Sequence, residues 1–117
     1  MPYRIEYSPD AEDHLRALIA RQRKTVLMGH YAFSEKARME MEADSLTELD
    51  VAESILNAVA IYKRLRSRSP FSKGAAEYLY VIQSTNMEGL MIYTKGKLVR
   101  EADVETYNFL ISSKKAF

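Results

Sequence analysis

The side chains best suited to chemistry lie in the second half of the chain, where cations and phenols gather. The interval between Glu53 and Glu77 contains no acidic residue, and its cations are Lys63, Arg64, Arg66, Arg68 and Lys73. Two later stretches add Tyr78, Tyr80, Tyr93, Lys95 and Lys97. The net charge of the whole chain is only +1. A local basic segment on a nearly neutral protein predicts a site for an anion such as a phosphate group.

The later stretches are expected to be strands. Residues 78–82 and 90–94 are rich in aromatic and β-branched side chains, and residues 86–89 between them predict a hairpin loop. In paired strands Tyr78 and Tyr80 share one face of the sheet, and Tyr93 and Lys95 also share one face. Whether these two faces coincide depends on the register of pairing, which the sequence leaves open.

The end of the chain predicts a further turn and two more strands. Lys95, Gly96 and Lys97 predict a turn that leads into a strand over residues 97–99. Residues 106–111 predict the last strand. Lys97 stays on the face of Tyr93 and Lys95 as long as this strand remains extended.

The first half predicts one strand and three helices. Residues 3–7 alternate as a half-buried strand does, and Ser8 with Pro9 then starts a helix that runs to about residue 27. Residues 34–43 predict a second helix. Thr47 and Asp50 form a capping-box pattern for a third helix, which is expected to end near residues 60–62.

This order predicts an α+β fold. A strand, three helices and a β-meander fit an antiparallel sheet, made of the N-terminal strand and the C-terminal meander, with the helices packed against it. The meander does not suit parallel βαβ packing. The length of 117 residues predicts a single domain over residues 1–117.

Composition narrows the function classes. The chain has no Cys, which excludes disulfides, thiolate zinc sites and a cysteine nucleophile. The two His residues make no recognisable metal-ligand pattern, so neither a metal nor another cofactor is expected. No stretch approaches the roughly 20 apolar residues that span a bilayer, and the first residues lack an apolar signal-peptide core. We therefore expect a cytoplasmic protein with no membrane partner.

Three segments of the chain resemble the RelE/ParE-like superfamily of bacterial toxins. Residues 3–11 resemble its opening strand, Ser-Pro cap and long helix. Residues 33–39 and 46–51 resemble a small domain family of the superfamily, with Arg38 and Met39 in place but Lys36 where that family has His. Residues 78–80 and 93–95 resemble the functional strands of MqsR-type mRNA-cleaving toxins, although Tyr80 replaces a Lys.

This resemblance implies the toxin of a type II toxin–antitoxin pair, a metal-independent endoribonuclease that cleaves mRNA. Such cleavage needs a proton acceptor, a proton donor and cations around the phosphorane. The catalytic residues implied are Lys95 and Tyr78, with Arg68 stabilising the phosphorane. The RNA-binding residues implied are Lys63, Arg64, Arg66, Lys73, Tyr80, Tyr93 and Lys97. The partners implied are a cognate antitoxin and mRNA.

Two other functions stay open at the level of sequence. The opening strand and helix also suit a non-catalytic ParE-like inhibitor of a topoisomerase. The replacement of the family His by Lys36 suits an inactive relative that binds RNA or a protein without chemistry.

Overall fold

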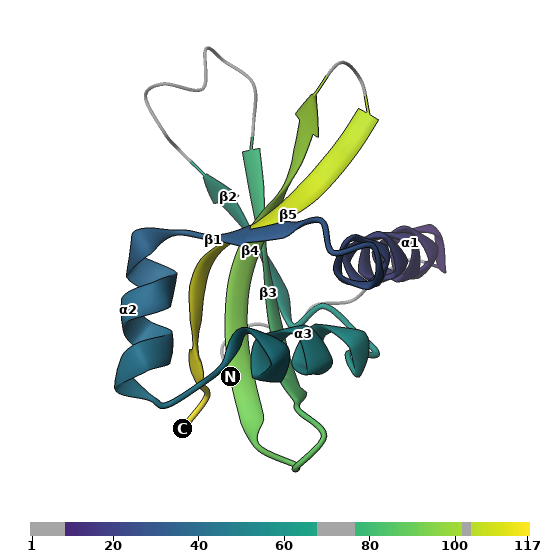
Figure 1. Cartoon of the computed structure of the whole chain (residues 1–117). Coiled ribbons are helices and arrows are strands. Elements are labelled where there is room, and N and C mark those ends of the chain that lie inside the picture. Colours follow the sequence, from purple (N-terminus) through teal and green to yellow (C-terminus); the bar gives the residue numbers. More distant parts are fainter. Residues whose placement is uncertain (1–8, 68–76, 102–103) are drawn as a thin grey trace.

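The computed structural model describes residues 9–67, 77–101 and 104–117 (Figure 1). Within these ranges it contains three helices and five strands. The helices are α1 (Pro9–Leu27), α2 (Glu35–Ala43) and α3 (Glu48–Leu56). The strands are β1 (Tyr31–Phe33), β2 (Lys63–Ser67), β3 (Glu77–Thr85), β4 (Met91–Glu101) and β5 (Val104–Lys115). The α+β class is confirmed, whereas the strand expected over residues 3–7 lies outside the described residues.

The strands form one mixed sheet in the order β1-β5-β4-β3-β2. Strands β2 to β5 pair antiparallel, but β1 runs parallel to β5, so the prediction of a purely antiparallel sheet is wrong at this edge. The backbone N–H of Asn108 donates to the carbonyl of His30, and the N–H of Ser34 donates to the carbonyl of Leu110. The chain between β1 and β5 passes through two helices and three strands, which is ample length for a parallel connection.

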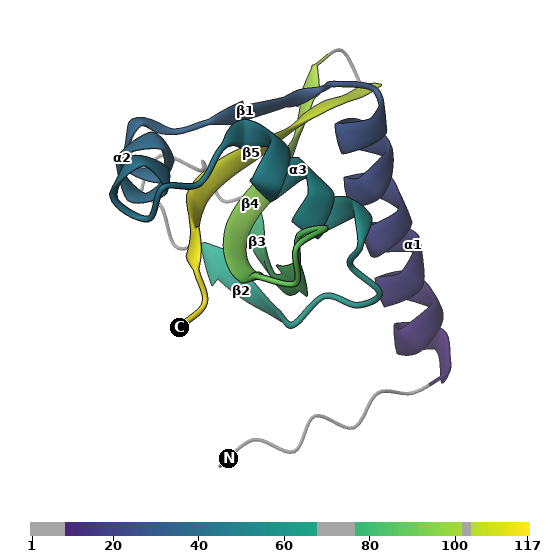
Figure 2. The ribbon, with the colours of Figure 1, turned by 60° about the horizontal axis from the view of Figure 1, so that its bottom comes forward.

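The core lies between the helices and one face of the sheet. Val51 and Ile55 of α3 pack in one cluster with Ile92 and Leu110 of the sheet. Leu18 and Ile19 of α1 belong to a second cluster with Ile82. Figure 2 shows α3 lying across β3 and β4, with α1 beside it. We call this side of the sheet the helix face.

The helices begin where the sequence predicts and α3 ends earlier. Helix α1 has the predicted bounds, Ser34 is the N-cap of α2, and Thr47 and Asp50 form the predicted capping box of α3. Helix α3 stops at Leu56 rather than near residues 60–62. The reason is tertiary: Ala58 and Ile61 are buried in the second cluster, and the backbone N–H of Tyr62 already donates to Val81 of β3.

The predicted hairpin is confirmed and the predicted second turn is wrong. The side-chain oxygen of Asn86 accepts from the backbone N–H groups of Glu88 and Leu90, and Gly89 has a φ of +84°, which favours glycine. Residues 95–97, in contrast, continue β4 without a turn. A Cβ at Gly96 would lie 2.6 Å from Oδ1 of Asn108. Gly96 therefore permits close packing of β4 against the side chains of β5.

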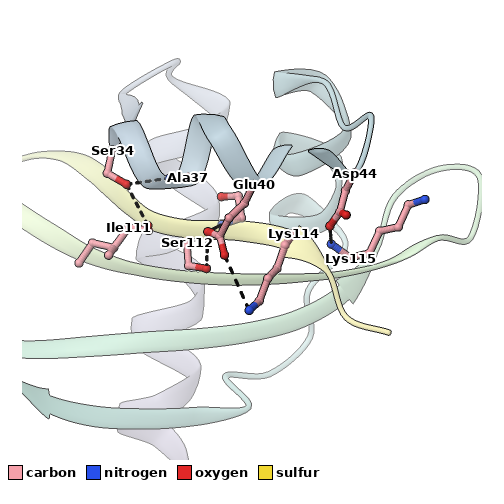
Figure 3. A network of polar contacts seen from close by, with 9 residues as sticks. Ser34, Ala37, Glu40, Asp44, Ile111, Ser112, Lys114 and Lys115 are labelled. Atoms are coloured by element: carbon pink, nitrogen blue, oxygen red, sulfur yellow. Dashed lines mark hydrogen bonds and ion pairs between the residues drawn. The ribbon is translucent and has the colours of Figure 1, made fainter. Parts of the chain in front are cut away.

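Helix α2 takes the place of a neighbouring strand along the last part of β5 (Figure 3). Where β1 ends, the hydroxyl of Ser34 donates to the carbonyl of Ile111. Further on, the carboxylate of Glu40 accepts from the backbone N–H of Ser113 and from the hydroxyl of Ser112. These side chains satisfy backbone groups that an open strand edge would leave unpaired.

None of the helices in the described part of the chain is long and apolar enough to cross a membrane.

Candidate functional site

The register of the sheet divides the predicted site residues between two faces. Lys63 of β2 and Lys95 of β4 both pair with Val81 of β3, so the three side chains form one row on the face opposite the helices. The next row contains Arg64, Tyr80 and Gly96, and it points to the helix face. Adjacent residues of a strand point to opposite faces, and this alternation fixes the division.

Lysines from three strands gather on the side away from the helices, which we call the lysine face. Tyr93 and Lys97 belong to it by alternation with Lys95 along β4, which stays extended. Gln83 and Lys114 belong to it as the cross-strand partners of Tyr93. The lysine face is thus defined by Lys63, Gln83, Tyr93, Lys95, Lys97 and Lys114.

The lysine face has an apolar centre and a charged margin. Val81 is fully buried between Lys63 and Lys95, a position that the aliphatic stems of neighbouring lysines commonly cover. Lys63 is exposed and Lys95 half-buried. The ammonium of Lys114 lies 5.4 Å from the ring centroid of Tyr93 and 3.7 Å from a carboxylate oxygen of Glu40. Glu40 therefore offsets the charge of Lys114 at the β5 side, and the positive charge of Lys63 and Lys95 lies towards β2.

Arg64 and Tyr78 form a separate stack on the helix face. The guanidinium carbon of Arg64 lies 4.4 Å from the centroid of the Tyr78 ring, within the range of a cation–π contact. Tyr78 remains 36% exposed and Arg64 is also exposed, so the stack meets solvent beyond the covered part of the helix face. We call this pair the Arg64–Tyr78 stack.

The structure brings together four of the predicted residues and separates others. Lys63, Tyr93, Lys95 and Lys97 share the lysine face, whereas Arg64, Tyr78 and Tyr80 belong to the helix face. The predicted catalytic pair of Lys95 and Tyr78 is therefore on opposite faces of the sheet. Arg66 lies in β2, where its backbone pairs with Tyr78. Arg68 and Lys73 lie outside the described residues.

Gln83 and Lys114 are members of the lysine face that the sequence prediction did not include. The last strand was expected to end at residue 111, but β5 continues to Lys115. A longer strand places Lys114 opposite Tyr93. Residues 112–115 are Ser-Ser-Lys-Lys and show no alternation of apolar and polar side chains, so no signal in the sequence marked this position.

A second group of cations lies at the end of α1, beside a hollow of about 370 Å³. Arg21, Lys24 and His30 line it together with Thr25 and Met28. The C-terminal end of a helix carries a partial negative charge, which the cation of Lys24 in the last turn balances. This helix end is thus a poorer place for an anion than the lysine face.

The described residues contain no cluster of potential metal ligands. Among them no group of three or more His, Asp or Glu side chains is close enough to hold a metal ion.

Comparison of the chain with protein-family models, with curated proteins and with solved structures finds no match.

Proposed function

We propose that this protein binds single-stranded RNA on the lysine face and acts there as the mRNA-cleaving toxin of a toxin–antitoxin pair. The observation that carries the proposal is the row in which Lys63 and Lys95 flank Val81, continued along β4 by Tyr93 and Lys97. Ammonium groups on an extended surface suit the phosphates of a single strand, and an aromatic ring among them suits an unpaired base. A toxin of this kind acts on mRNA in the cytoplasm.

Cleavage through the 2′-hydroxyl would use the groups that share the lysine face. The ammonium of Lys95 would stabilise the negative charge of the phosphorane. Tyr93 lies on the same face two residues away, and its phenol would protonate the leaving 5′-oxygen. Solvent water would accept the proton of the 2′-hydroxyl. In this scheme Tyr93 is the catalytic tyrosine, in place of the Tyr78 that the resemblance implied.

A cognate antitoxin is the protein partner that this function requires. Because the lysine face is positively charged, an acidic segment of the antitoxin would cover it and exclude RNA.

A second candidate function is RNA binding without cleavage. The separation of Tyr78 from Lys95 favours it, because the phenol and the ammonium that the toxin resemblance implies as a catalytic pair cannot reach the same phosphate from opposite faces.

One set of measurements tests both candidates. Purified wild type, Lys95→Ala and Tyr93→Phe are mixed with a labelled single-stranded RNA, and both binding and shortening of the RNA are followed. Lys24→Ala is the control, because Lys24 is an exposed lysine of α1, on the other side of the sheet. We expect Lys95→Ala to weaken binding and to abolish cleavage, Tyr93→Phe to slow cleavage more than binding, and Lys24→Ala to resemble wild type.

The outcomes separate the proposals. RNA that is bound but never shortened supports the second candidate. RNA that is not bound by wild type rejects both. Inducible expression adds a cellular readout: a toxin arrests growth and depletes transcripts, and Lys95→Ala relieves the arrest.

A further inference from the structure

The lysine face and the Arg64–Tyr78 stack meet at one margin of the sheet. Strand β2 is the last in the strand order, so it forms an edge of the sheet. Lys63 and Arg64 are consecutive residues of this edge strand and point to opposite faces. A ligand that passes over the edge therefore meets an ammonium on one side and a guanidinium on the other.

The two sides offer different chemistry. On the lysine face, the ammonium groups of Lys63 and Lys95 lie in one row and act as point charges for phosphates. On the other side, the guanidinium of Arg64 is planar and is held by the ring of Tyr78 at 4.4 Å. A planar guanidinium fixed on an aromatic ring is a ready surface for a nucleic-acid base, since bases stack on both groups.

We propose that single-stranded RNA crosses the β2 edge, with phosphates bound to Lys63 and Lys95 on the lysine face and a base stacked on the Arg64–Tyr78 stack. This inference rests on the proposed function and assigns a role to the residues that the register separates from Lys95. The exposure of Arg64 and the 36% exposure of Tyr78 leave the stack accessible to a base. The ligand is single-stranded, because paired bases keep their faces stacked within the duplex.

The test compares two labelled decamers of equal charge, an ordinary single-stranded RNA and one in which every base is replaced by an abasic spacer. Arg64→Lys keeps the charge but loses the planar group, and Tyr78→Leu loses the ring. We expect each variant to bind the ordinary decamer about tenfold more weakly and the abasic decamer as wild type does. Tyr78→Phe, which keeps the ring, should bind both as wild type does. Phe117→Leu is the control for an exposed aromatic residue, because Phe117 is 98% exposed and follows β5.

Lys95→Ala separates this inference from the proposed function. The loss of affinity in Lys95→Ala should be the same for both decamers, because a contact to a phosphate does not depend on whether a base is present. If Lys95→Ala weakens binding but Arg64→Lys and Tyr78→Leu do not, RNA stays on the lysine face and the crossing is rejected. Equal weakening of both decamers by Tyr78→Leu also rejects base stacking. If wild type binds neither decamer, the proposed function fails together with the crossing.

Discussion

The carboxylate of Asp44, the C-cap residue of α2, accepts a hydrogen bond of 2.9 Å from the backbone N–H of Lys115 in β5. Glu40, one turn earlier in α2, does the same for the N–H of Ser113. Alternate backbone N–H groups of β5 thus point at carboxylates of a helix instead of at carbonyls of a strand. The two edges of the sheet consequently differ. At one edge, α2 and its C-cap cover the part of β5 that extends past β1. Strand β2 forms the other edge.

Removal of the Glu40 carboxylate tests how much the hydrogen bonds between α2 and β5 stabilise the fold. Glu40→Ala leaves the buried N–H of Ser113 and the hydroxyl of Ser112 without their acceptor. We expect the free energy of unfolding to fall by about 1–3 kcal/mol, measured by urea denaturation. Glu42→Ala is the matched control, because Glu42 is exposed on the same helix and should change stability by less than about 0.5 kcal/mol. Equal effects of the two variants would show that the contact to β5 contributes nothing.

Substitution of Gly96 tests the close approach of β4 to β5. In Gly96→Ala the new methyl group would lie 2.6 Å from Oδ1 of Asn108 and 3.1 Å from the carbonyl oxygen of Phe109. We expect a loss of about 1–3 kcal/mol in the free energy of unfolding. The double variant with Asn108→Ala should lose less than the sum of the two single losses, because part of the clash disappears. Simple additivity would mean that Gly96 and Asn108 do not interact.

The lowered pKa of Asp50 predicts that the stability of the protein depends on pH. Its pKa is lowered, first because the backbone N–H of Thr47 donates a hydrogen bond to the carboxylate, and also through the side chains of Thr47 and Asn86. A pKa lower in the folded state than its unfolded value of about 3.9 gives a stabilisation that is complete above that value. It is lost as the pH falls through the folded pKa. We expect urea denaturation between pH 6 and pH 2.5 to show this acid loss in wild type.

Asp50→Asn is the comparison for this titration. The variant should be less stable than wild type by about 1 kcal/mol at pH 6, the typical value of a helix cap, and the difference should shrink at low pH. A constant difference across the range would assign the acid sensitivity to other carboxylates.

The salt dependence of RNA binding counts the phosphate contacts of the lysine face. Each cation that neutralises a phosphate of a single strand adds about 0.7 to the slope of the logarithm of the binding constant against the logarithm of salt concentration. Lys63→Ala should therefore reduce the magnitude of the slope by about 0.7, as measured by fluorescence anisotropy between 50 and 200 mM salt. Lys24→Ala should leave the slope unchanged. An unchanged slope in Lys63→Ala would remove this residue from the RNA-binding surface.

Local signals in the sequence predicted the local structure well. The Thr47–Asp50 capping box and the Asn86–Gly89 hairpin loop depend on neighbouring residues, and both are present as predicted. The turn predicted at Gly96 is wrong because the need for glycine arises from close packing against Asn108, which lies twelve positions away in another strand. Likewise, β1 has only three residues, too few to predict a strand from the sequence, and its pairing with β5 holds it in place.

The candidate site was predictable in composition but not in arrangement. The alternation along β4 placed Tyr93, Lys95 and Lys97 together, and the structure agrees. The face of Tyr78 relative to Lys95 depends on which residue of β3 pairs with which residue of β4. A shift of one residue would have put both on one face, and nothing near either residue fixes that choice.

The pairing of β1 with β5 also governs when the chain can fold during its synthesis. Phe33 of β1 pairs with Leu110, and the apolar side chains of α3 pack on Ile92 and Leu110. The amino-terminal half therefore leaves the ribosome with its apolar side chains still lacking the sheet that covers them. Assembly must wait until the last strand has been translated, because a product that stops before Asn108 would lack the residues that pair with β1 and the Leu110 side chain of the first cluster.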